Sequence, residues 1–333
     1  MPVSAVTGTD RAFIAADVGG THVRVGLVRA GEAQPLQVQH YRKYACAQYA
    51  GLTEILQDFL NDLPGKPVRH GVIASAGYPL EDGTVITANL PWRLSPSDTR
   101  QHLDFDDLSL VNDFEAVAHA AAHVDASQVL QLTGPADAAP GPLLILGPGT
   151  GLGAAVWIPA GNRAVVLPTE AGQAALAAGN ALEMELVTHL LQSRSHVSIE
   201  HALSGPGLLN LYQALCALRQ ASPVHAAPGD VTAAALQGDD ALARQALDVF
   251  CGLLGSTVGD LALLYGAHGG IYLAGGFLPQ IRQFLLQSSF VERFLNKGPM
   301  RQALQRIPVK LVEHGQLGVI GAAQWYLDRS REQ

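Results

Sequence analysis

Charged residues are scarce in this chain of 333 residues, and they form no dense cluster. Only 15% of the residues are charged against 48% that are hydrophobic, and no five like charges occur in succession. The 21 Lys and Arg residues are outnumbered by 29 Asp and Glu residues, which gives a net charge of -8. This composition excludes a largely disordered chain. It also argues against a nucleic-acid-binding protein, because such proteins rely on clustered Lys and Arg.

Cysteine is rare as well. The three cysteines, Cys46, Cys216 and Cys251, are far apart and form no CxxC pair, so the sequence indicates neither a zinc site nor a redox pair. The apolar run that follows Asp10 and Arg11 is too short for a secretory signal. We therefore expect a cytoplasmic protein.

Two stretches without any charge, 138–162 and 261–281, are long enough to cross a membrane. Glycine and proline interrupt both of them, and a lipid-exposed helix broken in this way would leave backbone groups without partners. We expect no membrane partner and interpret both stretches as buried strands joined by glycine turns.

Glycine, in contrast, is abundant, with 35 residues, and two glycine-rich segments share one pattern. The apolar run Phe13–Asp17 leads into Val18-Gly19-Gly20-Thr21, and the run Leu143–Leu146 leads into Gly147-Pro148-Gly149-Thr150-Gly151. A second strand-like segment follows each turn. The pattern indicates two related α/β halves, each with a glycine turn at the edge of its sheet.

The first turn is suited to phosphate. Glycines let backbone N–H groups approach phosphate oxygens, Thr21 adds a hydroxyl, and Asp17 is placed to hold Mg²⁺ directly or through water. An ordinary hairpin turn is the alternative. The second turn does not match the dinucleotide-binding fingerprint, because Leu152 stands where the third glycine belongs. It suits the far end of a triphosphate as a partner to the first turn.

Three further segments carry candidate chemistry. Asp113, after Asn112 at the end of a strand, can accept the proton of an attacking hydroxyl, or it can cap the helix that follows. Carboxylates and amides suit vicinal hydroxyls, but each of them taken alone is more typical of a solvated surface group. The residues of this kind are Glu170, Gln173 and Glu200. Gly275-Gly276 follows another apolar strand and suits either a nucleobase or a plain helix entrance.

Taken in order, these segments resemble the bacterial ATP-dependent glucokinase family. The resemblance runs from about residue 13 to 325. It rests on Asp17–Thr21, Leu110–Phe114, Gly149–Gly153, Val197–Glu200 with Leu203–Leu208, Gly270–Gly276 and Ile307–Val309. The zinc-binding cysteine cluster of the related repressor and kinase group is absent, which favours the zinc-free branch.

The resemblance implies a two-domain actin-like ATPase (hexokinase-type) α/β fold with an interdomain cleft. We expect a small domain of residues 1–113 plus 315–333 and a large domain of 114–314. It also implies ATP and Mg²⁺ as co-substrate and cofactor without zinc, and a homodimer. The activity implied is transfer of the ATP γ-phosphoryl group to the 6-hydroxyl of glucose, with Asp113 as the base.

The resemblance also assigns the residues of the site. Those expected to bind sugar are Asn89, Asn112, Asp113, Glu170, Gln173 and Glu200. Those expected to bind ATP are Ala16, Asp17, Val18, Gly19, Gly20, Thr21, Gly149, Thr150, Gly151, Gly275 and Gly276.

One position departs from the family. The chain reads Thr169-Glu170-Ala171-Gly172-Gln173, so Gln173 stands where the family has a histidine that contacts the sugar. Loss of one good polar contact costs about 1–3 kcal/mol. We therefore expect weaker glucose affinity or a changed sugar preference. A kinase of another hexose or amino sugar, and a sugar-sensing regulator without turnover, are the alternatives.

Overall fold

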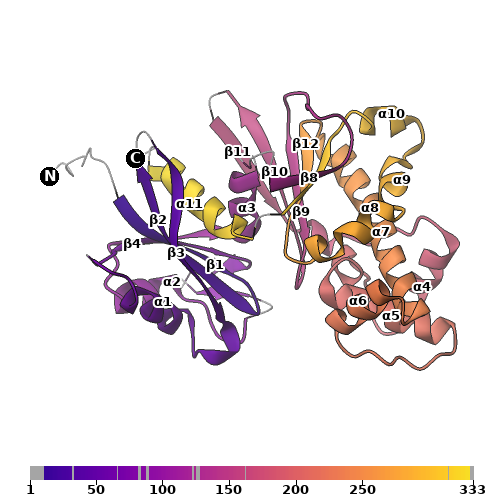
Figure 1. Cartoon of the computed structure of the whole chain (residues 1–333), viewed down its shortest axis with the longest axis horizontal. Coiled ribbons are helices and arrows are strands. Elements are labelled where there is room, and N and C mark those ends of the chain that lie inside the picture. The colour runs from indigo at the N-terminus through magenta and orange to yellow at the C-terminus, as the bar shows by residue number, and fades with distance from the viewer. Residues whose placement is uncertain are drawn as a thin grey trace. The chain divides into compact units, whose positions relative to one another are not determined.

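The computed structural model describes residues 11–31, 34–65, 67–81, 84–87, 90–121, 124, 128–161, 163–313 and 315–330. The chain forms two compact units (Figure 1). The second unit is Val124–Gly315, and the first is made of the described residues before and after it. The first boundary thus lies ten residues later than the expected boundary at residue 113, because the helix after Asp113 packs against the last helix of the chain.

The first unit is a five-stranded sheet with helices on both faces. Its strands follow the order β3-β2-β1-β4-β7, and β5 and β6 pair separately. The elements are β1 (Arg11–Val18), β2 (His22–Gly31), β3 (Gln34–Ala45), α1 (Leu52–Asn61), β4 (His70–Ser75), β5 (Tyr78–Pro79), β6 (Val85–Ile86), α2 (Pro96–His102), β7 (Asp107–Asn112), α3 (Asp113–Ala121) and α11 (Leu317–Ser330).

The middle of strand β1, Phe13–Ala16, is apolar and buried because both faces of the sheet are covered. Ile14 and Ala16 pack in a cluster with α1, whereas Phe13 and Ala15 pack in a second cluster with α11. Figure 1 accordingly shows α1 and α11 on opposite sides of this sheet. Because successive side chains of β1 point to opposite faces of the sheet, this one strand contributes to two hydrophobic cores.

The second unit repeats this order and extends it. Its sheet runs β11-β10-β9-β12-β13-β8, in which β9 and β10 are antiparallel while β9, β12 and β13 are parallel. The elements are β8 (Val129–Thr133), β9 (Leu143–Pro148), β10 (Leu152–Ala160), β11 (Arg163–Thr169), α4 (Ala181–Leu191), α5 (Gly205–Leu218), α6 (Pro228–Gln237), α7 (Ala241–Tyr265), β12 (Gly270–Leu273), α8 (Arg282–Gln287), α9 (Phe290–Leu295), α10 (Arg301–Leu304) and β13 (Val309–Val312).

Helix α7 forms the centre of the second unit. It is the one helix among the described residues that is long and apolar enough to cross a bilayer, yet 67% of its most apolar window is buried inside the unit. Its apolar surface is therefore used in packing against α5, α6 and α9. The expectation that 261–281 consists of strands and turns is wrong for its first five residues, which belong to α7.

Candidate active site

In the first unit, three parallel strands end side by side at one edge of the sheet. Val18 of β1 pairs with Ser75 of β4, and Ser75 pairs with Asn112 of β7. The glycine turn after β1 and the Asn112-Asp113 pair after β7 therefore lie at the same edge, two strand spacings apart, or about 10 Å. The topology thus brings a phosphate-type turn and a carboxylate together.

The Asn112-Asp113 pair is also the start of helix α3. The Asn112 side-chain oxygen accepts the N–H groups of Phe114 and Glu115, both at 3.0 Å, so Asn112 caps the helix. Asp113 is the first helical residue, and its Oδ1 accepts the Phe114 N–H at 2.9 Å. The cap is thus formed mainly by Asn112, and the amide NH₂ of Asn112 is the group suited to a sugar oxygen.

Asp17 forms an ion pair that the sequence analysis did not include. Arg24 lies directly opposite it on β2, and its Nη1 is 3.2 Å from Asp17 Oδ2. Burial raises the pKa of the Asp17 carboxyl, and the charge of Arg24 offsets part of that rise. The hairpin register of β1 and β2 was the available signal, since a turn after Val18 places residues 17 and 24 face to face.

The first glycine turn is closed by its own backbone. The Gly19 N–H donates to the His22 carbonyl at 3.0 Å, and the Thr21 carbonyl accepts the Cys46 N–H at 2.9 Å. The Gly19 N–H is therefore engaged within the turn itself. Ala16 and Val18 are buried in the sheet, so their side chains contribute to the core.

The second glycine turn is also closed by a hydrogen bond within its own backbone. The Gly149 N–H donates to the Gly151 carbonyl at 2.7 Å, and the Gly149 carbonyl accepts the Gly205 N–H at 2.8 Å. The N–H and the carbonyl of Gly149 are therefore both engaged. Gly275 lies beside this turn with φ +99°, and a Cβ on it would stand 3.0 Å from the Pro148 carbonyl oxygen, so glycine is required there. The turn and the Gly275-Gly276 pair are therefore neighbours at the ends of the parallel strands β9 and β12.

Glu200 joins the second turn to the candidate sugar residues. Its Oε2 accepts the Leu152 N–H at 2.7 Å, and its Oε1 accepts Nε2 of Gln173 at 3.3 Å. A Cβ on Gly151 would overlap the Glu200 carboxylate, which explains glycine at this position. Gln173 and Glu200 are held together because Ala175 bridges to Ser198 between them.

Glu170 and Asn89 complete the expected sugar residues. Glu170 is exposed and precedes the 3₁₀ helix Ala171–Gln173, so it lies one turn from Gln173. Asn89 lies outside the described residues. The second unit therefore brings Glu200 into contact with Gln173 and close beside Gly151, and places Glu170 nearby in the chain.

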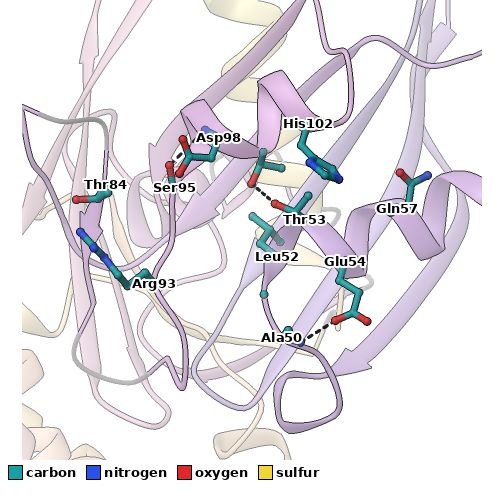
Figure 2. A pocket seen from close by; sticks show the side chains of 12 residues that line it. Ala50, Leu52, Thr53, Glu54, Gln57, Thr84, Arg93, Ser95, Asp98 and His102 are labelled. Carbon is teal, nitrogen blue, oxygen red and sulfur yellow. Dashed lines mark hydrogen bonds between the residues drawn. The ribbon is translucent and has the colours of Figure 1, made fainter.

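A pocket of about 640 Å³ in the first unit lies elsewhere, between the starts of α1 and α2 (Figure 2). Its polar groups already bond one another: Thr53 Oγ1 is 2.8 Å from Thr99 Oγ1, and Glu54 accepts the Ala50 N–H at 2.7 Å. None of the described candidate residues lines it. The pocket therefore belongs to the helix packing rather than to this site.

The sequence is similar to that of one known protein family over nearly its whole length. The sequence model of the family described as Glucokinase matches residues 14–329, nearly the whole chain. The chain belongs to the glucokinase family. A glucokinase-like protein of Xylella fastidiosa (strain 9a5c) is 60% identical to it over 319 residues, which is 95% of either chain. The glucokinase of Zymomonas mobilis subsp. mobilis (strain ATCC 31821 / ZM4 / CP4) is 38% identical over 323 residues, covering 96% of this chain and 99% of that protein.

Solved glucokinase structures confirm the expected fold. The glucokinase from an Antarctic psychrotroph superposes with a TM-score of 0.82 at 34% identity, covering 96% of this chain and 99% of that one. The two-domain actin-like ATPase class that the family resemblance implied is therefore confirmed.

Proposed function

We propose that the protein is an ATP-dependent glucokinase, which transfers the γ-phosphoryl group of ATP to the 6-hydroxyl of glucose and yields glucose 6-phosphate and ADP. One observation carries this proposal: a carboxylate, Asp113, lies at the same sheet edge as the glycine turn after β1. Phosphoryl transfer to a hydroxyl needs this combination, a phosphate cradle and a group that accepts the hydroxyl proton.

In this proposal Asp113 is the catalytic base. Its carboxylate takes the proton of the 6-hydroxyl as the oxygen attacks the γ-phosphorus. The N–H groups of Gly20, Thr21, Thr150 and Gly151 hold the phosphates, since partial positive charges fixed in place stabilise charge that develops on phosphate oxygens. The Gly275-Gly276 segment takes the adenosine end.

Candidate sugar-binding groups occur in each unit. Glu200 binds vicinal hydroxyls with the lone pairs that Leu152 and Gln173 do not use, and Glu170 adds a second carboxylate. Asn112 donates from its amide nitrogen because its oxygen is engaged in the helix cap. Asn89 is assigned to the sugar from the family resemblance.

The donor set fits Mg²⁺ bound chiefly by ATP and water. No group of three His, Cys, Asp or Glu side chains suited to a metal occurs among the described residues. Asp17 is a single carboxylate beside the first turn, and Arg24 already engages one of its oxygens. Mg²⁺ prefers few protein carboxylates together with phosphates and water. When bound, it neutralises charge on the phosphates.

Gln173 favours a second candidate activity, phosphorylation of another hexose or an amino sugar. Its side chain donates to Glu200, so a carboxamide rather than an imidazole presents hydrogen-bonding groups to the sugar. A regulator that binds sugar without turnover is the competing class. We further propose a cytoplasmic homodimer that binds neither nucleic acid nor membrane.

ADP release measured across a panel of hexoses tests the proposal. We expect glucose-dependent release in the wild type and a loss of about 10²–10⁴-fold in kcat for Asp113→Asn, because a positioned base contributes about that much. The matched control is Asp107→Asn, at the other end of β7, where the carboxylate accepts hydrogen bonds from the Ser109 hydroxyl. ADP release with another sugar but not with glucose would support the second candidate activity. Sugar binding without any ADP release would support a regulator.

A further inference from the structure

Cys46 lies next to the first glycine turn, and its N–H, its thiol and its carbonyl each form a hydrogen bond. It begins the 3₁₀ helix Cys46–Gln48 directly after β3, and only 1% of it is exposed. Its N–H donates to the Thr21 carbonyl at 2.9 Å, and its Sγ donates to the Gly19 carbonyl at 3.3 Å. Its own carbonyl accepts Nε1 of Trp92 at 3.4 Å.

The thiol contact fixes the direction of a phosphate-binding N–H. The Gly19 carbonyl and the Gly20 N–H belong to one planar trans peptide unit, in which they point in opposite directions. A Gly19 carbonyl held toward Cys46 therefore aims the Gly20 N–H away from Cys46 and out of the turn. Glycine residues rotate freely in the absence of such a contact, since they lack a side chain.

Trp92 adds a further contact to Cys46. Its indole packs against the same apolar cluster that contains Cys46, and its Nε1 donates to the Cys46 carbonyl. Contacts at both the N–H and the carbonyl of Cys46 therefore hold its thiol in place beside the glycine turn.

We propose that Cys46 is a positioning residue for phosphoryl transfer, which orients the Gly20 N–H toward the nucleotide. This inference rests on the proposed function of the first turn. Burial raises the pKa of the Cys46 thiol, so the sulfur keeps its proton and remains a donor at neutral pH.

Calorimetric titration with a non-hydrolysable ATP analogue and Mg²⁺ tests the positioning role without requiring turnover. Cys46→Ala removes the donor, and we expect nucleotide binding to weaken about three- to tenfold, the usual range for one hydrogen bond. Cys46→Ser restores a donor of similar reach and should recover most of the affinity. Cys216→Ala deletes an equally buried thiol from α5 of the second unit and should leave affinity unchanged. Melting temperatures of all variants verify folding.

Equal nucleotide affinity in Cys46→Ala and wild type, or no recovery in Cys46→Ser, overturns the proposal. A wild type that binds nucleotide but phosphorylates no sugar overturns the proposed function and leaves the nucleotide titration decisive for Cys46.

Discussion

At the scale of single residues, Gln173 is the position where this chain departs from the family resemblance. Its Nε2 donates to Glu200 Oε1 at 3.3 Å, and its backbone carbonyl is 2.9 Å from Nε2 of His196. The backbone of residue 173 is therefore fixed, and only its side chain differs in what it offers the sugar.

We predict that Gln173→His lowers the KM for glucose. An imidazole restores the sugar contact of the family, and one good polar contact is worth about 1–3 kcal/mol. Steady-state kinetics at saturating ATP measures the change, and Gln173→Ala provides the opposite control with a raised KM. An unchanged KM in Gln173→His would remove Gln173 from sugar recognition. A lower KM for a different sugar would support the second candidate activity.

Local signals in the sequence predicted individual residues well where the partners are close in the chain. Asp17, Thr21, Asn112 and Asp113 sit at strand ends that apolar runs and glycines mark plainly. The Glu200 contacts could not be predicted from local pattern, because Leu152 lies 48 positions away from Glu200 and Gln173 lies 27 positions away. Such distant pairs depend on the packing of whole elements.

At the scale of elements, a buried ion pair joins α4 to α9. Arg293 contacts both carboxylate oxygens of Glu183, at 2.6 and 2.9 Å, and also donates to Ser256 of α7. The Glu183 side chain is 2% exposed and the Arg293 side chain 13%. The Gly179 N–H and the Asn180 amide also donate to Glu183, so its oxygens are fully satisfied. This network ties three helices of the second unit together.

We predict that Glu183→Gln and Arg293→Met each lower the free energy of unfolding by about 3–5 kcal/mol, because each leaves a buried charge without its partner. The double variant Glu183→Leu with Arg293→Met should be less destabilised than either single variant, since apolar side chains replace both charges. Urea unfolding monitored by circular dichroism measures these values. A double variant as unstable as the sum of the singles contradicts this account.

A capping box formed by Ser198 and His201 stabilises the start of the 3₁₀ helix Ile199–His201. The His201 Nδ1 accepts the Ser198 N–H at 3.0 Å, and Ser198 Oγ accepts the His201 N–H at 3.4 Å. A protonated imidazole cannot accept this bond. Burial lowers the pKa of His201, and the nearby Arg194 lowers it further.

The pKa shift of His201 predicts a loss of stability in acid. Because the folded pKa is below the unfolded value of about 6.5, the unfolded chain takes up the proton first as pH falls. Neutral His201 therefore contributes fully to the free energy of unfolding above about pH 6.5. This contribution declines as the pH falls below about 6.5 toward the folded pKa of His201. His201→Asn, which keeps an acceptor but does not titrate, should show a shallower decline. Urea titrations from about pH 8 to pH 5 compare the two slopes, and parallel slopes contradict the prediction.

Some elements carry weak signals in the sequence. Both α2 and α6 begin with proline, at Pro96 and Pro228, which obscures the start of a helix. Proline is tolerated at the first helical position, because the N–H it lacks has no partner there. Strand β3 is rich in polar residues because it is the edge strand of its sheet, so its apolar signal is weak.

At the scale of the whole molecule, the repeated Gly-Thr turns correctly indicated two related halves. The order β3-β2-β1-β4-β7 in the first unit corresponds strand by strand to β11-β10-β9-β12-β13 in the second. Each glycine turn follows the central strand of its five. The extra strand β8 and the helices α4 to α10 could not be deduced from that repeat, since they occur in one half alone.

The net charge of -8 leads to a prediction for the whole protein. ATP is anionic, and neither glycine turn contains a lysine. We therefore expect chelation of divalent cations to abolish sugar-dependent ADP release, while glucose still raises the melting temperature through the sugar residues alone. Parallel assays with and without chelator measure both effects. Turnover that persists without divalent cations would exclude the proposed role of Mg²⁺.

The second unit is inserted into the first, and its ends meet. The Glu313 N–H donates to the Gln128 carbonyl at 3.0 Å, beside the pairing of β13 with β8. The chain therefore enters and leaves the second unit through two strands that are hydrogen-bonded to each other. The last helix, α11, then returns to cover Phe13, Val72 and Ala74 of the first sheet. During synthesis, this face of the first sheet stays uncovered until the whole second unit has been made. A chain interrupted before Leu317 thus exposes an apolar sheet face to other nascent chains, and aggregation is the expected fate of prematurely terminated copies.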